Sequence, residues 1–345
     1  MREFLGETGL FLYATANHVF GMMYWIWFPG LVVSGYLWLR WHHVLAAALL
    51  ERQRERESSP AWLTALLLGI TGSPDRGTSL DEARHLVSRG AGARSVLLHL
   101  VASQQLAPYA LAFLVTNLGL EFFLGQLLGA LAMALVASGL VRLVPDDRWE
   151  QARKAQAWAT TDEPRLLTGG MPSRPMRGIL RYLAGEVRVL WKGVVVGLVL
   201  AGLIGAAGRT DWWPDLGKVG GGGFWTALLN AVAGAALALV FFAAPIGHQL
   251  VGTMLWKAYT LTFPGIVAFF LATLANPRAI RHYCRMYGAG LGLYLGGIFL
   301  VSAAIGALFV AGLFWVVGFE VTHVPRFHEI VNEIMIFFSV FGKTM

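Results

Sequence analysis

The stretch FFLGQLLGALAMALVASGL, residues 122–140, decides the fold class of this protein. It carries no charged side chain, and its length approaches the roughly 20 residues that a helix needs to cross a bilayer. A second apolar stretch, VVVGLVLAGLIGAA, fills residues 194–207, and similar stretches recur along the chain. Because lipid cannot hydrogen-bond an open backbone, the sequence predicts an all-α, polytopic helical membrane protein.

The composition also indicates a membrane protein. Of the 345 residues, 56% are hydrophobic and 14% are charged, and the mean hydropathy is +0.59, whereas a soluble domain carries about 25% charged residues. The net charge of +7 does not indicate a nucleic-acid partner, because Lys and Arg gather in the cytoplasmic loops of membrane proteins. We expect a multi-pass protein of the bacterial inner (cytoplasmic) membrane, in contact with membrane lipids.

Polar stretches divide the chain into four parts. We expect a first membrane half at 1–144, a cytoplasmic basic linker at 145–185, a second membrane half at 186–320 and an interfacial tail at 321–345. Full spans are expected at 23–39, 122–144, 189–207, 224–244 and 287–318. A charged loop at 51–57 and a polar insert at 75–94 are expected to lie outside lipid.

Two further apolar segments, residues 95–118 and 247–274, are interrupted near their middles by Pro108 and Pro264. PYALAFLV at 108–115 aligns with PGIVAFFL at 264–271, with Pro, Ala and Phe in common. Basic residues after Val144 place the C-terminal end of the span at 122–144 inside, and those at 278–285 place the N-terminal end of its counterpart at 287–318 inside, so equivalent helices run in opposite directions. The sequence therefore predicts two inverted-topology halves, each with a Pro-interrupted helical hairpin. Such pairs are typical of secondary transporters, whose substrate site lies between the repeats.

Polar side chains in the broken segments are candidates for a substrate path, because such groups are costly inside a membrane. The candidates are Gln104, Thr116, Asn117, Glu121, His248, Lys257 and Thr273. Each also has a structural interpretation. Lys257 can extend its amine from a helix end to the interface, Glu121 can mark an interface, and hydroxyls can bond to their own helix.

No residue pattern indicates catalysis, a metal or another cofactor, so an enzyme is not expected. Cys284 is the single cysteine, which excludes an internal disulfide and a multi-cysteine metal site. His18, His42 and His43 are expected near helix ends, with their rings at the headgroups. His323, His328 and Glu329 could bind a divalent ion, but a solvated face is the simpler interpretation.

Several short motifs resemble one family of membrane proteins. They are Leu255-Trp256, Thr262-Phe263-Pro264-Gly265, Ala268-Phe269, Tyr283, Tyr287 and Gly288, with Thr116-Asn117-Leu118 and Glu121 as the first-half counterpart. In this order they resemble the predicted permeases that include the trivalent organoarsenical efflux permeases. The resemblance implies two inverted halves whose helical hairpins enter the membrane and turn back, with a substrate path between them.

The chain departs from that family in one region. Members carry a Ser/Cys-rich motif before the first hairpin, but residues 72–94 contain no cysteine, and Thr273 stands where an acidic residue is expected. Thiolates select soft metal and metalloid ions, so capture of arsenic by thiols is not expected. Two hypotheses remain. One is a secondary transporter that exports a small solute, with a possible homodimer. The other is a permease-derived, transport-inactive structural subunit with partner subunits in a larger membrane complex.

Overall fold

The computed structural model describes residues 28–54, 61–72, 76–157, 175–208, 223–241 and 245–319, with a few single positions and short pieces outside these ranges. Every regular element in these ranges is a helix. Five of the described helices are long and apolar enough to cross a membrane, and α6 (Ala93–Gln105) and α7 (Pro108–Leu118) form a bent pair that has the length and composition of either a broken span or a re-entrant loop. The prediction of an all-α polytopic membrane protein is confirmed.

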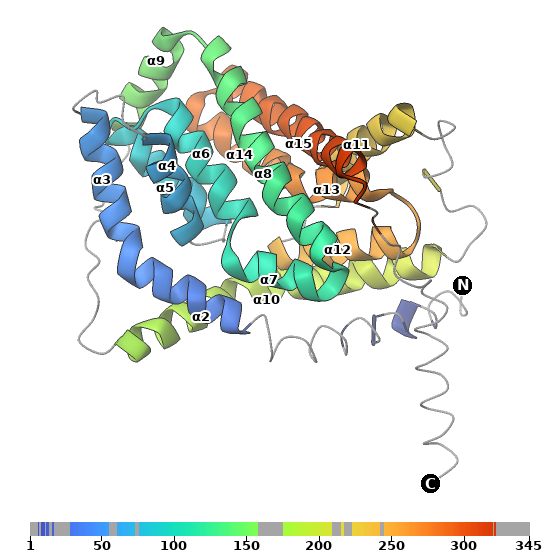
Figure 1. Ribbon diagram of the computed structural model, residues 1–345. Coiled ribbons are helices and arrows are strands. Elements are labelled where there is room, and N and C mark those ends of the chain that lie inside the picture. The colour runs from blue at the N-terminus through green and yellow to red at the C-terminus, as the bar shows by residue number, and fades with distance from the viewer. Residues whose placement is uncertain are drawn as a thin grey trace.

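The first half consists of helices that pack beside one long helical segment, here called the rod. The rod consists of α2 (Phe28–Leu37), the π-helix η2 (Trp38–His42) and α3 (His43–Arg54), on the left of Figure 1. Beside it lie α4 (Ala61–Thr71), α5 (Arg76–Ser88) and α6 (Ala93–Gln105), followed by α7 (Pro108–Leu118), α8 (Leu120–Leu140), the short 3-10 helix η3 (Val141–Leu143) and α9 (Asp146–Ala157). α6 packs against α4, α5 and α8.

The second half begins with α10 (Pro175–Ala207), which crosses beneath the other helices in Figure 1. It continues through α11 (Gly223–Val240), α12 (Pro245–Lys257), α13 (Phe263–Leu271), the 3-10 helix η4 (Ala272–Ala275), α14 (Pro277–Tyr287) and α15 (Ala289–Val317). α10 packs on α12, and α11 packs on α13. α13 and η4 are buried along their whole length, so the second broken segment lies in protein.

Both proline-interrupted segments are bent where a proline begins the next helix. α6 and α7 meet at an angle of 41°, and Pro108 is the first residue of α7. Pro264 is the second residue of α13. A proline is tolerated at these positions because the first N–H groups of a helix have no partner within it. The turn before α13 contains Tyr259, which has a positive φ of 55°.

The two halves meet along the long helices that follow the broken segments. α8 packs against α15, and both run diagonally through the middle of Figure 1. A Cβ atom on Gly306 would lie 2.7 Å from the carbonyl oxygen of Gly129, so the two backbones approach closely at this point. Small residues at such crossings let membrane helices gain packing contacts that a larger side chain would prevent.

The structure corrects three boundaries that the sequence indicated. Residues 38–54 continue the first helix through a π-helical turn, so the chain does not enter a loop at 51. The insert at 75–94 contains the helix α5, and one of its faces is buried through Leu80, Ala83, Leu86 and Val87. α10 begins at Pro175, inside the expected linker. The tail at 322–345 lies outside the described residues.

Candidate functional site

A buried amide cluster joins the two broken segments. The side-chain nitrogen of Gln105, the last residue of α6, donates to the carbonyl oxygen of Leu271 at 3.0 Å and to the hydroxyl of Thr273 at 2.7 Å. The side-chain oxygen of Gln105 accepts from the amide of Gln126 on α8. All three polar side chains are buried, with exposed fractions of 1% for Gln105, 3% for Gln126 and 7% for Thr273. Four elements from both halves therefore meet at one side chain.

The break between α6 and α7 places Gln105 at this position. Leu106 ends α6, and its N–H still donates to the carbonyl oxygen of Ala102. Pro108 then starts α7 in a new direction. A long amide side chain at the end of α6 can thus extend into the second half, whereas a straight helix would carry the chain past it.

Two buried amide oxygens beside this break have no hydrogen-bond partner among the described residues. They are Oε1 of Gln126 and Oε1 of Gln249. Gln126 bonds to Gln105 just before the break, and Gln249 on α12 donates to the carbonyl oxygen of Ala110 just after it, at 3.1 Å. A buried acceptor without a donor is costly. The two oxygens are therefore suited to bind a solute that donates hydrogen bonds.

His248 connects the second broken segment to the end of α11. Its Nε2 atom lies 2.7 Å from the carbonyl oxygen of Phe269, and its Nδ1 atom lies 3.2 Å from that of Phe241. The imidazole also stacks on the ring of Phe269 at 4.0 Å between centroids. Carbonyl oxygens only accept, so a neutral ring can donate to one of them and an imidazolium to both.

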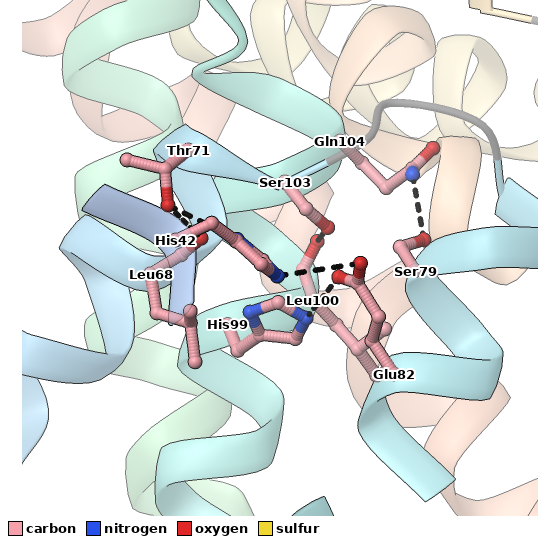
Figure 2. Close-up of polar contacts among 9 residues, drawn as sticks. All are labelled: His42, Leu68, Thr71, Ser79, Glu82, His99, Leu100, Ser103 and Gln104. Carbon is pink, nitrogen blue, oxygen red and sulfur yellow. Dashed lines mark hydrogen bonds and ion pairs between the residues drawn. The ribbon is translucent and has the colours of Figure 1, made fainter. Parts of the chain in front are cut away.

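A second polar cluster, the triad of His42, Glu82 and His99, is formed by residues of η2, α5 and α6 (Figure 2). The Nε2 atom of His42 is 3.4 Å from one carboxylate oxygen of Glu82, and the Nε2 atom of His99 is 3.4 Å from the other. The exposed fractions are 2% for His42, 6% for Glu82 and 0% for His99. The expectation that His42 lies at the headgroups is wrong, because packing of α4, α5 and α6 buries the end of η2.

Hydrogen bonds link the triad to its neighbours on both sides. Thr71, the last residue of α4, lies 3.1 Å from Nδ1 of His42. Ser79, one turn before Glu82 on α5, accepts from the amide of Gln104 at 2.9 Å. α5 and α6 are therefore in contact at two points, Glu82 with His99 and Ser79 with Gln104 (Figure 2), and Gln104 directly precedes Gln105 of the amide cluster.

The remaining candidates occupy different positions. Asn117 donates to the carbonyl oxygen of Phe113 in its own helix, at 2.9 Å. Glu121 lies in the first turn of α8, where a carboxylate interacts favourably with the helix dipole. Lys257 lies in the last turn of α12 and is partly buried. Thr116 lies on α7, and its side chain is outside the described residues. Of the candidates, Thr273 bonds directly to Gln105, and Gln104 is the residue before Gln105 in α6.

Sequence reasoning missed Glu82 and Gln126. Glu82 lies in a segment with enough charge to look like a solvated insert. One signal could have located it: Leu80, Ala83 and Leu86 recur at helical spacing, which indicates a buried face on a helix. Gln126 is a single polar residue in an otherwise apolar span, and an intramembrane amide usually faces protein.

Within the described parts of the chain, no group of three His, Cys, Asp or Glu residues has the geometry to hold a metal ion. His18, His323, His328 and Glu329 lie outside the described residues.

Comparison with known proteins identifies the family. A family model described as a predicted permease matches residues 10–312. The chain belongs to this predicted permease family, ArsP_1. Membership of a permease family favours a transporter over an enzyme. A Mycobacterium tuberculosis protein that carries the name permease Rv2963 is 24% identical over 262 residues. The match covers 72% of this chain and 64% of the length of that permease. No solved structure matches the chain significantly.

Proposed function

We propose that this permease is a secondary transporter that exports a small solute across the bacterial inner membrane. The solute path runs beside the break between α6 and α7, where the two halves meet. The observation that carries this proposal is the amide cluster, in which Gln105 bonds to Leu271 and Thr273 of the other half. Hydrogen bonds of this kind can be exchanged for bonds to a solute as two halves move relative to each other.

The lining chemistry suggests the class of solute. The acceptor oxygens of Gln126 and Gln249 and the hydroxyl of Thr273 are uncharged. Neutral groups in an apolar setting favour a neutral solute with N–H or O–H donors, because a bare charge would lose its hydration without compensation. A thiophilic ion is disfavoured, since Cys284 lies on α14 and its thiol donates to the carbonyl oxygen of Ala289 at 3.7 Å.

Uptake by proteoliposomes that contain the purified full-length chain tests this proposal. The probes are labelled erythritol and acetamide, which donate hydrogen bonds, and phenylarsine oxide, which is thiophilic. We expect uptake of a donor probe above that of protein-free liposomes. No uptake of any probe, together with a membrane protein that co-purifies at fixed stoichiometry, would overturn the proposal in favour of the structural subunit.

Gln105→Ala is the decisive variant. It removes the amide that joins Gln126, Leu271 and Thr273, and we expect the uptake rate to fall about tenfold, the equivalent of ~1.4 kcal/mol and within the usual range for a lost buried hydrogen bond. Gln151→Ala is the matched control, because Gln151 is exposed on α9, and it should transport like the parent. Equal rates for the two variants would place the path elsewhere. Asn117→Ala and Lys257→Ala show whether those residues line the path.

A further inference from the structure

The triad of His42, Glu82 and His99 is a buried ionisable group that the proposed solute path does not use. Its members come from η2, α5 and α6, which meet only in the folded chain (Figure 2). His42 closes the π-helical turn η2, and π-helical turns often occur at functional sites. Ionisable residues buried among membrane helices are costly, which favours a functional role for them.

Hydrogen bonding fixes which nitrogen of His42 carries a proton. The hydroxyl of Thr71 has one hydrogen, and it donates to the carbonyl oxygen of Leu68 at 2.9 Å. The carbonyl oxygen of Leu68 needs this donor. In a regular helix it would accept from the N–H of Gly72, but that N–H donates to the carbonyl oxygen of Gly69 instead. Thr71 can then only accept from His42, so Nδ1 of His42 is the protonated nitrogen.

This assignment determines the charge state of the triad. With Nδ1 protonated, the Nε2 atom that faces Glu82 carries a hydrogen only when His42 is an imidazolium. A neutral His42 would direct a lone pair at a carboxylate oxygen 3.4 Å away. His99 differs, because neither of its ring nitrogens has a hydrogen-bond partner among the described residues, while Nε2 lies 3.4 Å from a carboxylate oxygen of Glu82. Its neutral ring can thus carry the hydrogen on Nε2 and donate to Glu82.

The neutral arrangement of the whole triad is therefore an imidazolium at His42, a carboxylate at Glu82 and a neutral imidazole at His99. One proton more or less leaves a net charge in the protein interior, which is unfavourable. The contacts of 3.4 Å are looser than the roughly 2.7–2.9 Å of strong charge-assisted hydrogen bonds. The triad can therefore bind a proton and release it again.

We propose that His42, Glu82 and His99 form a proton-binding site, and that uptake and release of this proton drive the exchange of hydrogen bonds at Gln105. The second part rests on the proposed transport function. α5 and α6 provide the connection, because the bonds from Glu82 to His99 and from Ser79 to Gln104 hold the two helices together. A change in the charge of Glu82 or its partners shifts α6, and α6 ends in Gln105.

Other charged groups near the triad interact mainly with one another. Among the described residues, Tyr182 on α10 also lies close enough to Glu82 for an electrostatic interaction, and it interacts with Glu186 as well. On the flanks of α5, charge interactions connect Asp81, Arg84, His85 and Arg89 with His282 and Arg285 of α14. Arg40 on η2 and Arg94 on α6 are exposed, and Arg52 on α3 donates to Thr64. The groups that face the carboxylate of Glu82 within 3.4 Å are therefore the two histidines of the triad.

Trp38 provides a direct readout of proton binding. Its ring stacks with that of His42, at 6.2 Å between centroids and an angle of 24°, and a protonated imidazole quenches a neighbouring indole. The signal of Trp38 is the difference between the fluorescence of the wild-type protein and of Trp38→Phe, both as full-length chains in nanodiscs. We expect the Trp38 fluorescence to change in one step between about pH 5 and pH 9, the range in which histidine charge changes. No step would overturn the proposal.

Three variants and one ion test the assignment. His42→Gln should abolish the step, and Glu82→Gln should abolish it or move its midpoint by about one pH unit or more. His43→Gln is the matched control, because His43 is the next residue and is partly exposed, and it should titrate like the parent. A step that survives unchanged in His42→Gln would overturn the proposal. Saturable quenching by equimolar zinc would also overturn it, in favour of a metal site.

A pH gradient across proteoliposomes tests the coupling. A gradient of one pH unit can drive about tenfold accumulation per coupled proton. We expect the ratio of gradient-driven flux to flux at equal pH to fall to about one in Glu82→Gln, with His43→Gln unchanged. A wild-type ratio of one overturns the coupling but leaves the transporter intact. If no probe is transported at all, the proposed function fails, and the Trp38 titration still decides whether the triad binds a proton.

Discussion

At the scale of single residues, Glu82 determines how acid affects the fold. It lies on α5, which is not among the candidate membrane spans. Burial alone raises the pKa of Glu82, but the charges and hydrogen bonds of His42 and then His99 outweigh burial and lower the pKa from 4.5 to about 2. Glu82 therefore stays ionised across the neutral range.

This lowered pKa gives a prediction for acid stability. A carboxylate whose folded pKa lies below its unfolded value adds stability that is complete above the unfolded pKa and is lost as the pH falls to the folded pKa. For Glu82 this window runs from about pH 4.5 down to about pH 2. We expect the difference in unfolding midpoint between wild type and Glu82→Gln, measured by circular dichroism in detergent, to shrink across the window.

Asp81→Asn is the control for acid stability, because Asp81 is the neighbouring carboxylate on α5 and is exposed. The unfolding midpoint of Asp81→Asn should stay close to that of the wild type at every pH. If the difference in unfolding midpoint between wild type and Glu82→Gln stayed constant from pH 7 to pH 2, this would contradict the assignment of a paired carboxylate at this position.

At the scale of elements, contact between α4 and α6 sets the geometry of the triad. A Cβ atom on Gly69 of α4 would lie 2.5 Å from the carbonyl oxygen of His99 and 2.9 Å from the backbone nitrogen of Ser103. The backbones touch at the turn that carries His99, and Thr71, which fixes the tautomer of His42, follows two residues after Gly69. A larger residue at 69 would separate the two helices.

Gly69→Ala should therefore destabilise the protein, although alanine is the better helix former. Overpacking of this kind costs about 1–3 kcal/mol, and it should also weaken the pH step of Trp38. Gly297→Ala on α15 is the matched control, because nothing lies within 4 Å of the added Cβ. Thermal unfolding in the same detergent compares the two. Equal midpoints would show that α4 can move away from α6 without cost.

At the scale of the whole molecule, the two broken segments meet through polar side chains while the long helices α8 and α15 meet through glycines. The glycine contact supplies close packing, and the amide contact supplies bonds that can be exchanged. The proposed solute path does not include a thiol, since Cys284, the single cysteine of the chain, lies on α14.

Cys284→Ser should therefore transport the donor probes at the parental rate, whereas Gln105→Ala should not. The physical reason is that the Cys284 thiol bonds to the backbone of Ala289 near the start of α15. Uptake of labelled erythritol and acetamide by proteoliposomes measures both variants in parallel. A loss of transport in Cys284→Ser equal to that of Gln105→Ala would show that the solute path includes the thiol.

The sequence by itself determined that the protein lies in a membrane, that it is helical, and where the two segments are interrupted. These follow from local properties: apolar length decides whether a helix can span lipid, and a proline such as Pro108 is tolerated in the first turn of a helix but interrupts the interior of one. The tertiary structure alone decided that Gln105 meets Thr273, 168 positions away, and that His42 and His99 enclose Glu82. Partners so distant in the chain are chosen by packing, and a charged helix such as α5 looks like a loop until its neighbours bury it.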